Sequence, residues 1–140
     1  MKTGYRLNCF CLTLALFGCT KGSNDYNQMV PLEDLMENPK PYIEQRIETV
    51  GYAYFHEHTP STSLYLDEES SSDPFTESVV YLATNNLEES EELKACSGNS
   101  VMAFGVFKPQ SDIGLILHVD KGVRVINEQG EVKEFCYKPE

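Results

Sequence analysis

The run Gln45-Arg46-Ile47-Glu48-Thr49-Val50-Gly51-Tyr52-Ala53-Tyr54-Phe55-His56 predicts a long first β-strand. Residues at alternate positions of a strand point to opposite faces, and both sets carry bulky side chains here. A strand covered on both faces lies inside a sheet, so we expect this one to be central. Gly51 indicates a bend of the kind that the strands of a small barrel need.

Further strands are predicted on the C-terminal side of this run. They cover residues 63–66, 78–83, 100–107 and 115–119, and residues 123–126 either continue the last of these or pair beside it. Residues 132–137 predict a short terminal strand. Residues 67–73 are rich in Asp, Glu and Ser and precede Pro74, so we expect a loop there.

Two short helices are predicted. In residues 31–38, Leu32, Leu35 and Met36 share one helical face, and Pro31 suits a first helical position. Residues 87–95 form the second helix, with Asn86 as a cap and acidic side chains near its positive end. We expect the cluster at 88–92 to be a solvated helix face.

This order of elements, with a helix between the third and fourth strands, is that of the five-stranded OB barrel. We therefore expect a mostly β protein, with a small OB-like β-barrel over residues 31–140. The domain resembles OB-fold lipoproteins of bacterial envelopes. The resemblance lies in residues 32–35, 38–39 with Tyr42, 50–52, 63–66 and 101–107. It implies a fold and no particular reaction, because the fold carries many unrelated functions.

The N-terminus has the pattern of a secretory signal. Lys2 and Arg6 precede an uncharged run, 9–17, that is too short to span a bilayer. The run ends in Leu16-Phe17-Gly18-Cys19, which resembles the lipobox of bacterial lipoproteins. The resemblance implies that residues 1–18 are removed and that Cys19 becomes acylated. Thr20, where retention signals have Asp, implies an outer-membrane location facing the periplasm, and we interpret residues 19–30 as a flexible tether.

The chain is strongly acidic, with 22 Asp and Glu against 11 Lys and Arg and a formal net charge of −11. Phosphate backbones repel such a surface, and no local basic patch is visible in the sequence, so nucleic acid is not expected as a partner. The composition fits a soluble envelope domain or a domain that meets a basic partner.

The cysteines separate into two groups. Cys9 and Cys11 lie in the signal, Cys19 is the lipidation site, and Cys96 and Cys136 remain. An even pair in an oxidising compartment predicts a disulfide. A redox role is the alternative, although the spacing is not Cys-x-x-Cys.

Tyr52, Tyr54, Tyr65 and Tyr81 are the candidate ligand face. Aromatic side chains on the strands of an OB barrel can stack on bases or sugars, although the same residues also favour ordinary sheet packing. An oligosaccharide fits the acidic charge better than a nucleic acid does.

Two metal sites are conceivable and neither is expected. His56 and His58 lie two residues apart and could face one ion, with a third ligand from Asp67, Glu68 or His118. Residues 67–69 with Asp73 could bind calcium, but the spacing of a known calcium loop is missing. No cofactor is expected.

The sequence therefore favours a non-catalytic binding or adaptor module, held to the membrane through Cys19, with an envelope protein or glycan as its partner. No catalytic Ser/His/Asp pattern and no phosphate-binding Gly loop is present. The alternatives are an acidic inhibitor of a basic envelope enzyme such as a lysozyme, and a metal-dependent enzyme that uses His56 and His58.

Overall fold

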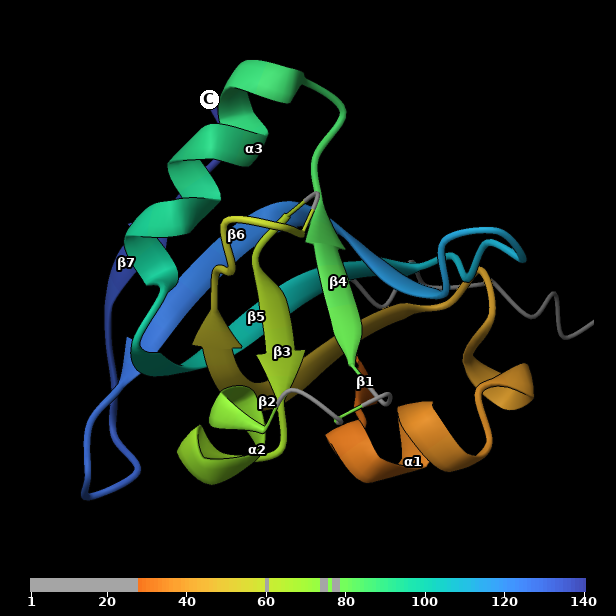
Figure 1. Ribbon diagram of the computed structural model, residues 1–140, viewed down its shortest axis with the longest axis horizontal. Helices are drawn as coiled ribbons and strands as arrows, with labels where there is room; N and C mark the ends of the chain where they lie inside the picture. The colour runs from red at the N-terminus through yellow and green to blue at the C-terminus, as the bar shows by residue number, and fades with distance from the viewer. Residues whose placement is uncertain (1–27, 60, 74–75, 77–78) are drawn as a thin grey trace, which may run out of the picture.

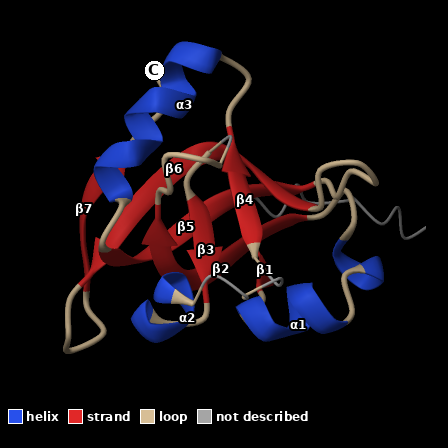
Figure 2. Cartoon of the chain, viewed as in Figure 1, coloured by secondary structure: helices blue, strands red, loops and turns tan. Residues whose placement is uncertain are grey.

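The computed structural model describes residues 28–59, 61–73, 76 and 79–140, and the side chains of residues 87–89 lie outside this description. The structure is built mainly from strands, with short helices at the periphery (Figures 1 and 2). The predicted signal and lipidation site fall outside the described residues. Within them, no helix has the length and apolar character needed to cross a membrane.

Five strands close into a barrel. They are β2 (Arg46–Tyr54), β3 (Ser63–Tyr65), β4 (Val80–Ala83), β5 (Asn99–Phe107) and β6 (Leu115–Ile126). Their spatial order is β2-β3-β4-β6-β5, and β5 returns to pair with β2. All these pairs are antiparallel except β4 with β6. The expected OB-like barrel is thus confirmed.

Side chains that alternate inward fill the barrel. On β2, Ile47, Thr49 and Ala53 are fully buried, whereas Val50 and Tyr54 face outward and are exposed. Leu64, Leu82, Phe107 and Leu117 enter the same core from the other strands. Helix α1 (Leu32–Glu37) adds Leu32 and Leu35 to it, as the helical spacing predicted.

Gly105 is required where β5 crosses β6. A Cβ atom built there would lie 2.1 Å from the carbonyl oxygen of His118, so no side chain fits. The register between the two strands shifts at Phe104/Gly105. This bulge lets β6 continue as one strand past residues 119–123. Residues 123–126 therefore continue the predicted strand over 115–119 and do not form a separate strand beside it.

A disulfide ties the C-terminal strand to the barrel. Strand β7 (Val132–Tyr137) pairs with β6, and Cys136 bonds to Cys96 in the short helix η2 (Leu93–Cys96), across a sequence separation of 40. The predicted terminal strand and its cysteine pairing are confirmed. Helix η2 follows α3 (Leu87–Glu92) directly, so the predicted helix over 87–95 is present as two pieces.

Two local predictions differ from the structure, and one further element was not predicted. Residues 67–73 contain a helix, α2 (Glu68–Ser72), because the Asp67 carboxylate accepts hydrogen bonds from both the amide and the hydroxyl of Ser70, each at 2.7 Å. The proposed tether ends early, since β1 (Gln28–Met29) pairs with β2 and Val30 is buried. A further turn of helix, η1 (Lys40–Tyr42), follows α1.

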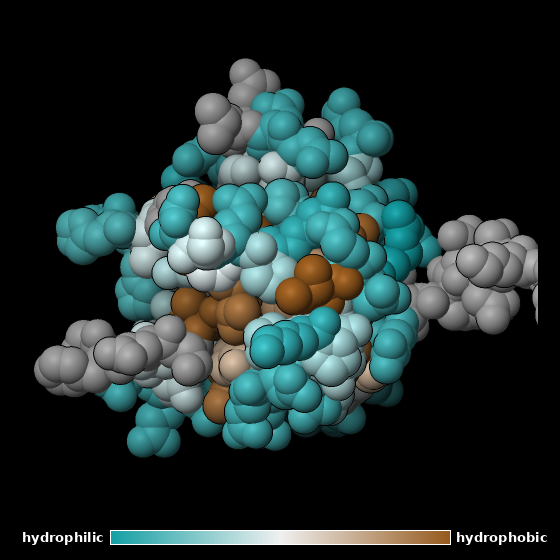
Figure 3. Space-filling model, turned by 90° about the vertical axis from the view of Figure 1, so that its right-hand side faces the viewer, coloured by the Kyte–Doolittle hydropathy of each residue, from teal (hydrophilic) through white to brown (hydrophobic). Residues whose placement is uncertain are grey.

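The described surface exposes few large apolar side chains. On the side that faces right in Figure 1, hydrophilic side chains surround a hydrophobic area near the centre (Figure 3). The large hydrophobic residues that are exposed are Met29, Ile43, Val50, Tyr54, Leu66, Ile113 and Phe135.

Candidate functional site

The four tyrosines of the predicted ligand face share the outer surface of β2, β3 and β4. Tyr52 lies directly opposite Tyr65, and Ser63 lies opposite both Tyr54 on β2 and Tyr81 on β4. Directly opposed residues project to the same side of a sheet, so all four rings lie on one face. Their inward neighbours Ala53, Leu64 and Val80 are fully buried in the core.

The rings are not equally accessible. Tyr54 is 36% exposed, whereas Tyr65 is only 5% exposed. Burial, with a smaller contribution from Tyr81, raises the pKa of Tyr65 above its ordinary value. Burial and the Glu68 carboxylate raise the pKa of Tyr52. Both phenols therefore remain protonated hydrogen-bond donors at neutral pH.

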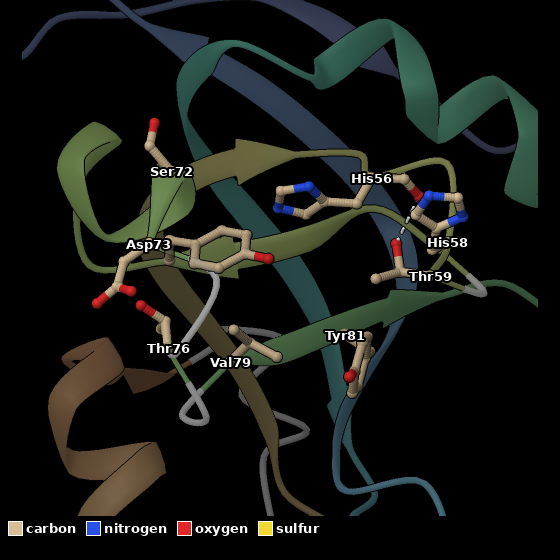
Figure 4. Close-up of a pocket in the computed structure, with 9 residues that line it drawn as sticks. His56, His58, Thr59, Ser72, Asp73, Thr76, Val79 and Tyr81 are labelled. Carbon is tan, nitrogen blue, oxygen red and sulfur yellow. Dashed lines mark hydrogen bonds between the residues drawn. The ribbon is translucent and has the colours of Figure 1, made fainter.

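His56 joins this aromatic face. It lies where the chain leaves β2, and its ring makes edge contacts with Tyr54 at 4.7 Å and with Tyr65 at 5.9 Å between ring centroids. His58 follows in the same loop and is exposed. The loop is held by Thr59, whose hydroxyl donates to the carbonyl oxygen of His56 at 2.9 Å (Figure 4).

A hollow of about 520 Å³ opens over this face. In Figure 4, His56, His58 and Thr59 stand at one end, and Ser72, Asp73 and Thr76 at the other. Tyr65, Val79 and Tyr81 complete the lining. The walls thus combine aromatic rings, hydroxyl groups and a carboxylate, which is a mixture suited to a polar ligand with an apolar face.

A second hollow of about 230 Å³ continues on the far side of Tyr81. Tyr81 lines both hollows. The second is lined further by Ser61, Ala83, Thr84, Ser90, Gln110, Ile113, Ile116 and His118. Gln110 and Ile113 of this lining belong to the segment between β5 and β6.

His118 contributes an imidazole to the second hollow. Burial, followed by the Lys108 ammonium group, lowers the pKa of His118 below its ordinary value, and Glu44 acts weakly in the opposite direction. The ring is therefore neutral at pH 7. Its Nε2 atom is buried and has no hydrogen-bond partner among the described residues.

The metal hypotheses gain no support from this geometry. Across the described residues, no three His, Cys, Asp or Glu side chains are grouped so that they could hold an ion. His56 and His58 line one hollow, but none of the third ligands named for them lines it with them. In the acidic segment, Asp67 is engaged as the cap of α2.

The sequence indicates only part of this site. Tyr65, Tyr81 and both histidines of the first hollow stand out from the sequence, whereas Thr59, Ser72, Thr76 and Val79 do not. The i, i+2 spacing of Val79 and Tyr81 places them on one face and could have added Val79. The second hollow gave no signal, because its residues come from segments that are distant in the sequence.

Comparisons with known proteins add little. No family model matches the chain, and no curated protein matches it. Among solved structures, it is similar to a putative aspartyl-tRNA synthetase from Leishmania major Friedlin, with 10% sequence identity and a TM-score of 0.41. The match covers 72% of this chain and 21% of that one. So remote a similarity carries no functional argument.

Proposed function

We propose that this chain is a lipid-anchored protein of the bacterial envelope, attached through Cys19 to the outer membrane, whose OB-like barrel is a non-catalytic module that binds an extended oligosaccharide. The observation that carries the binding role is the pair of hollows that meet at Tyr81. The two hollows, of about 520 and 230 Å³, together offer room for more than one sugar ring.

The chemistry of the walls supports this ligand class. Sugar rings have apolar faces that pack on aromatic side chains and hydroxyl edges that hydrogen-bond, and the site offers Tyr65 and Tyr81 beside Thr59, Ser72 and Thr76. Asp73 and the net charge of −11 disfavour a polyanion such as a nucleic acid.

The Thr59 hydroxyl, near the His56 imidazole, does not favour a catalytic role. The Thr59 hydroxyl lies near the carbonyl oxygens of His56 and Ser61, at 2.9 and 3.1 Å, so it bonds to backbone and not to an imidazole nitrogen. A nucleophile needs a base within hydrogen-bond reach. Thr59 and His56 are therefore proposed to shape the hollow.

Binding can be tested with N-acetylglucosamine oligomers of one to six units, by calorimetry and amide chemical shifts. Affinity should rise from one to three units and then level off. Tyr81→Ala should weaken binding of the longer oligomers about tenfold, which corresponds to ~1.4 kcal/mol. Phe135→Ala, which removes an exposed ring far from the site, is the matched control. Shift changes that avoid β3 and β4 would rule the site out.

The anchor is tested separately. The Leu16-to-Cys19 motif supports it, and Cys19→Ser should abolish incorporation of labelled palmitate and leave the chain outside the detergent-soluble membrane fraction. Continued labelling of the variant would contradict the assignment of Cys19.

A further inference from the structure

A second surface begins on β2 at Val50, one pleat from Tyr52 of the tyrosine face, and crosses β5, β6 and β7. The register places Val50 opposite Met102, Met102 opposite Arg124, and Arg124 opposite Phe135. These side chains form one row across β2, β5, β6 and β7, roughly 14 Å long at the usual strand spacing. We call the four residues together with Lys138 the basic aromatic row.

The row points outward. Val50 and Phe135 are 40% and 41% exposed, although both are large apolar residues. The register shift between Val123 and Arg124 turns Tyr137 into the core, where it is 3% exposed, and leaves Phe135 outside. The ring of Phe135 lies against Gly122, because a Cβ atom there would come within 2.9 Å of Phe135 Cδ1.

The charge of the row is opposite to that of the chain. The Arg124 guanidinium lies 5.0 Å from the centroid of the Phe135 ring, and the Lys138 ammonium 5.7 Å from it. Among the described residues, neither cation forms an ion pair, and Arg124 Nε donates to the backbone oxygen of Lys133 at 2.8 Å. Two cations thus gather around one exposed ring on an otherwise acidic protein.

Two basic side chains near the row are paired with carboxylates. Lys133 is paired with Glu131 at 2.7 Å, and Arg46 is paired with Asp120 at 2.8 Å. Glu48, one pleat along β2 from Val50 and opposite Phe104, adds a carboxylate to the adjoining part of this face. Glu134, next to Phe135, and Glu140, near Lys138, add further carboxylates along the chain, so the cationic character is confined to the two groups around the Phe135 ring.

The shape favours a flat, anionic occupant. None of these side chains lines either hollow, and a barrel surface is convex, whereas a bound peptide segment needs a groove for its side chains. Phe with Arg and Lys is the composition by which proteins rest on a lipid headgroup layer. The chain between Cys19 and the first described residue spans roughly 30 Å at most, so an anchored barrel stays within reach of the bilayer.

We propose that the basic aromatic row is a membrane-contact surface, which rests Phe135, Arg124 and Lys138 against anionic phospholipid headgroups. The inference rests on the proposed lipid anchor. Each cation should strengthen the contact on the order of fivefold.

The test exploits the absence of Trp from the chain. Phe135→Trp introduces a single Trp into the mature lipidated protein. This protein is reconstituted in vesicles of phosphatidylcholine with about one third phosphatidylglycerol, which is near the physiological anionic density. Brominated acyl chains in the same vesicles serve as the quencher. Leu66→Trp, at a residue that is 49% exposed elsewhere on the barrel, is the matched control.

The emission of the Phe135→Trp protein should be quenched and blue-shifted, and that of the Leu66→Trp protein should not. Adding Arg124→Glu and Lys138→Glu to the Phe135→Trp chain should abolish the quenching, and omitting phosphatidylglycerol should weaken it on the order of 25-fold in contact equilibrium. If the Phe135→Trp protein sediments with the vesicles but its Trp stays unquenched, the proposed contact surface is wrong, whereas the proposed lipid anchor is supported. If it neither sediments nor incorporates palmitate, the anchor itself fails.

Discussion

The two outer faces of the barrel share strand β2 and yet differ in almost every property. At one end of β2, Tyr52 and Tyr54 lie on the face over which a hollow opens, walled by loops, hydroxyl groups and a carboxylate. In the middle of the strand, Val50 faces outward at one end of the basic aromatic row, whose cations lie around Phe135 at the other end. Both faces arise because inward and outward side chains alternate along β2. The difference shows that the segments around a sheet, and not its strands, decide what its outer face can bind.

The core beneath both faces is common, and its loss should remove them together. Phe107 is fully buried, so Phe107→Ala should destabilise the fold by about 3–5 kcal/mol. Urea unfolding followed by tyrosine fluorescence and by amide signals from each face should show one shared transition. Phe135→Ala is the matched control and should change the unfolding free energy far less. Two separate transitions would contradict a common core.

The disulfide, in contrast, supports only one of the faces directly. Replacing Cys96 and Cys136 by Ser should cost about 3–4 kcal/mol of unfolding free energy by the chain-entropy estimate. The loss should appear first in β7, whose amide hydrogens should exchange faster than those of β3 and β4. Equal acceleration on both faces would show that the bond stabilises the barrel as a whole.

The pH dependence of folding stability should also distinguish the two faces, although by a smaller effect than the loss of the disulfide. Burial lowers the pKa of His118, next to the candidate site, below its unfolded value. The unfolded chain then binds more protons, so stability should fall as the pH drops through the unfolded pKa of about 6.5 and level off below the folded pKa. His118→Asn should flatten this slope in thermal scans between about pH 5 and 7. Arg124→Gln, in the basic aromatic row, should leave it unchanged.

The smallest effect is expected at the cap of α2. Hydrogen bonds from the Ser70 hydroxyl and amide hold the pKa of Asp67 below its usual value, so this contribution is present at neutral pH and is lost as the pH falls through the folded pKa. Asp67→Ala should slightly lower the melting temperature and speed amide exchange at Ser70. Asp67→Asn keeps an acceptor and should retain most of the protection; if it behaves like Ala, charge and not the cap is responsible.

The barrel was predictable from the sequence because its strands alternate clearly. The first predicted strand is central, since β2 pairs with both β3 and β5, whereas which of its faces points inward and the close approach at Gly105 became clear only from the structure. The order of strands then left few topologies, and the two cysteines of the domain had one way to pair.

The missed elements depend on single local contacts. Helix α2 consists largely of Ser and Glu and has little intrinsic helical preference; one carboxylate, that of Asp67, caps it. Strand β1 is two residues long and exists through pairing with Ile47 and Glu48. Neither contact leaves a periodic signal.

The sequence indicated Tyr65 and Tyr81 on strands and His56 and His58 in a loop, but not the rest of the candidate site. Alternation placed Tyr65 and Tyr81 on one face, but the hollows depend on where the loops fold back over that face. The basic aromatic row depends on registers among four strands and on a bulge, which a single sequence does not reveal.

The closing pair β2–β5 also sets a kinetic constraint. Ala53 pairs with Asn99, and Arg46 with Val106, so the second neighbour of β2 emerges from the ribosome only after β3, β4 and α3 have been made. No N-terminal fragment that stops before β5 can seal the barrel. Such nonlocal pairing slows folding into the range of roughly milliseconds to seconds. A chain that emerges N-terminus first therefore remains open, and accessible to chaperones, until β5 and β6 have followed.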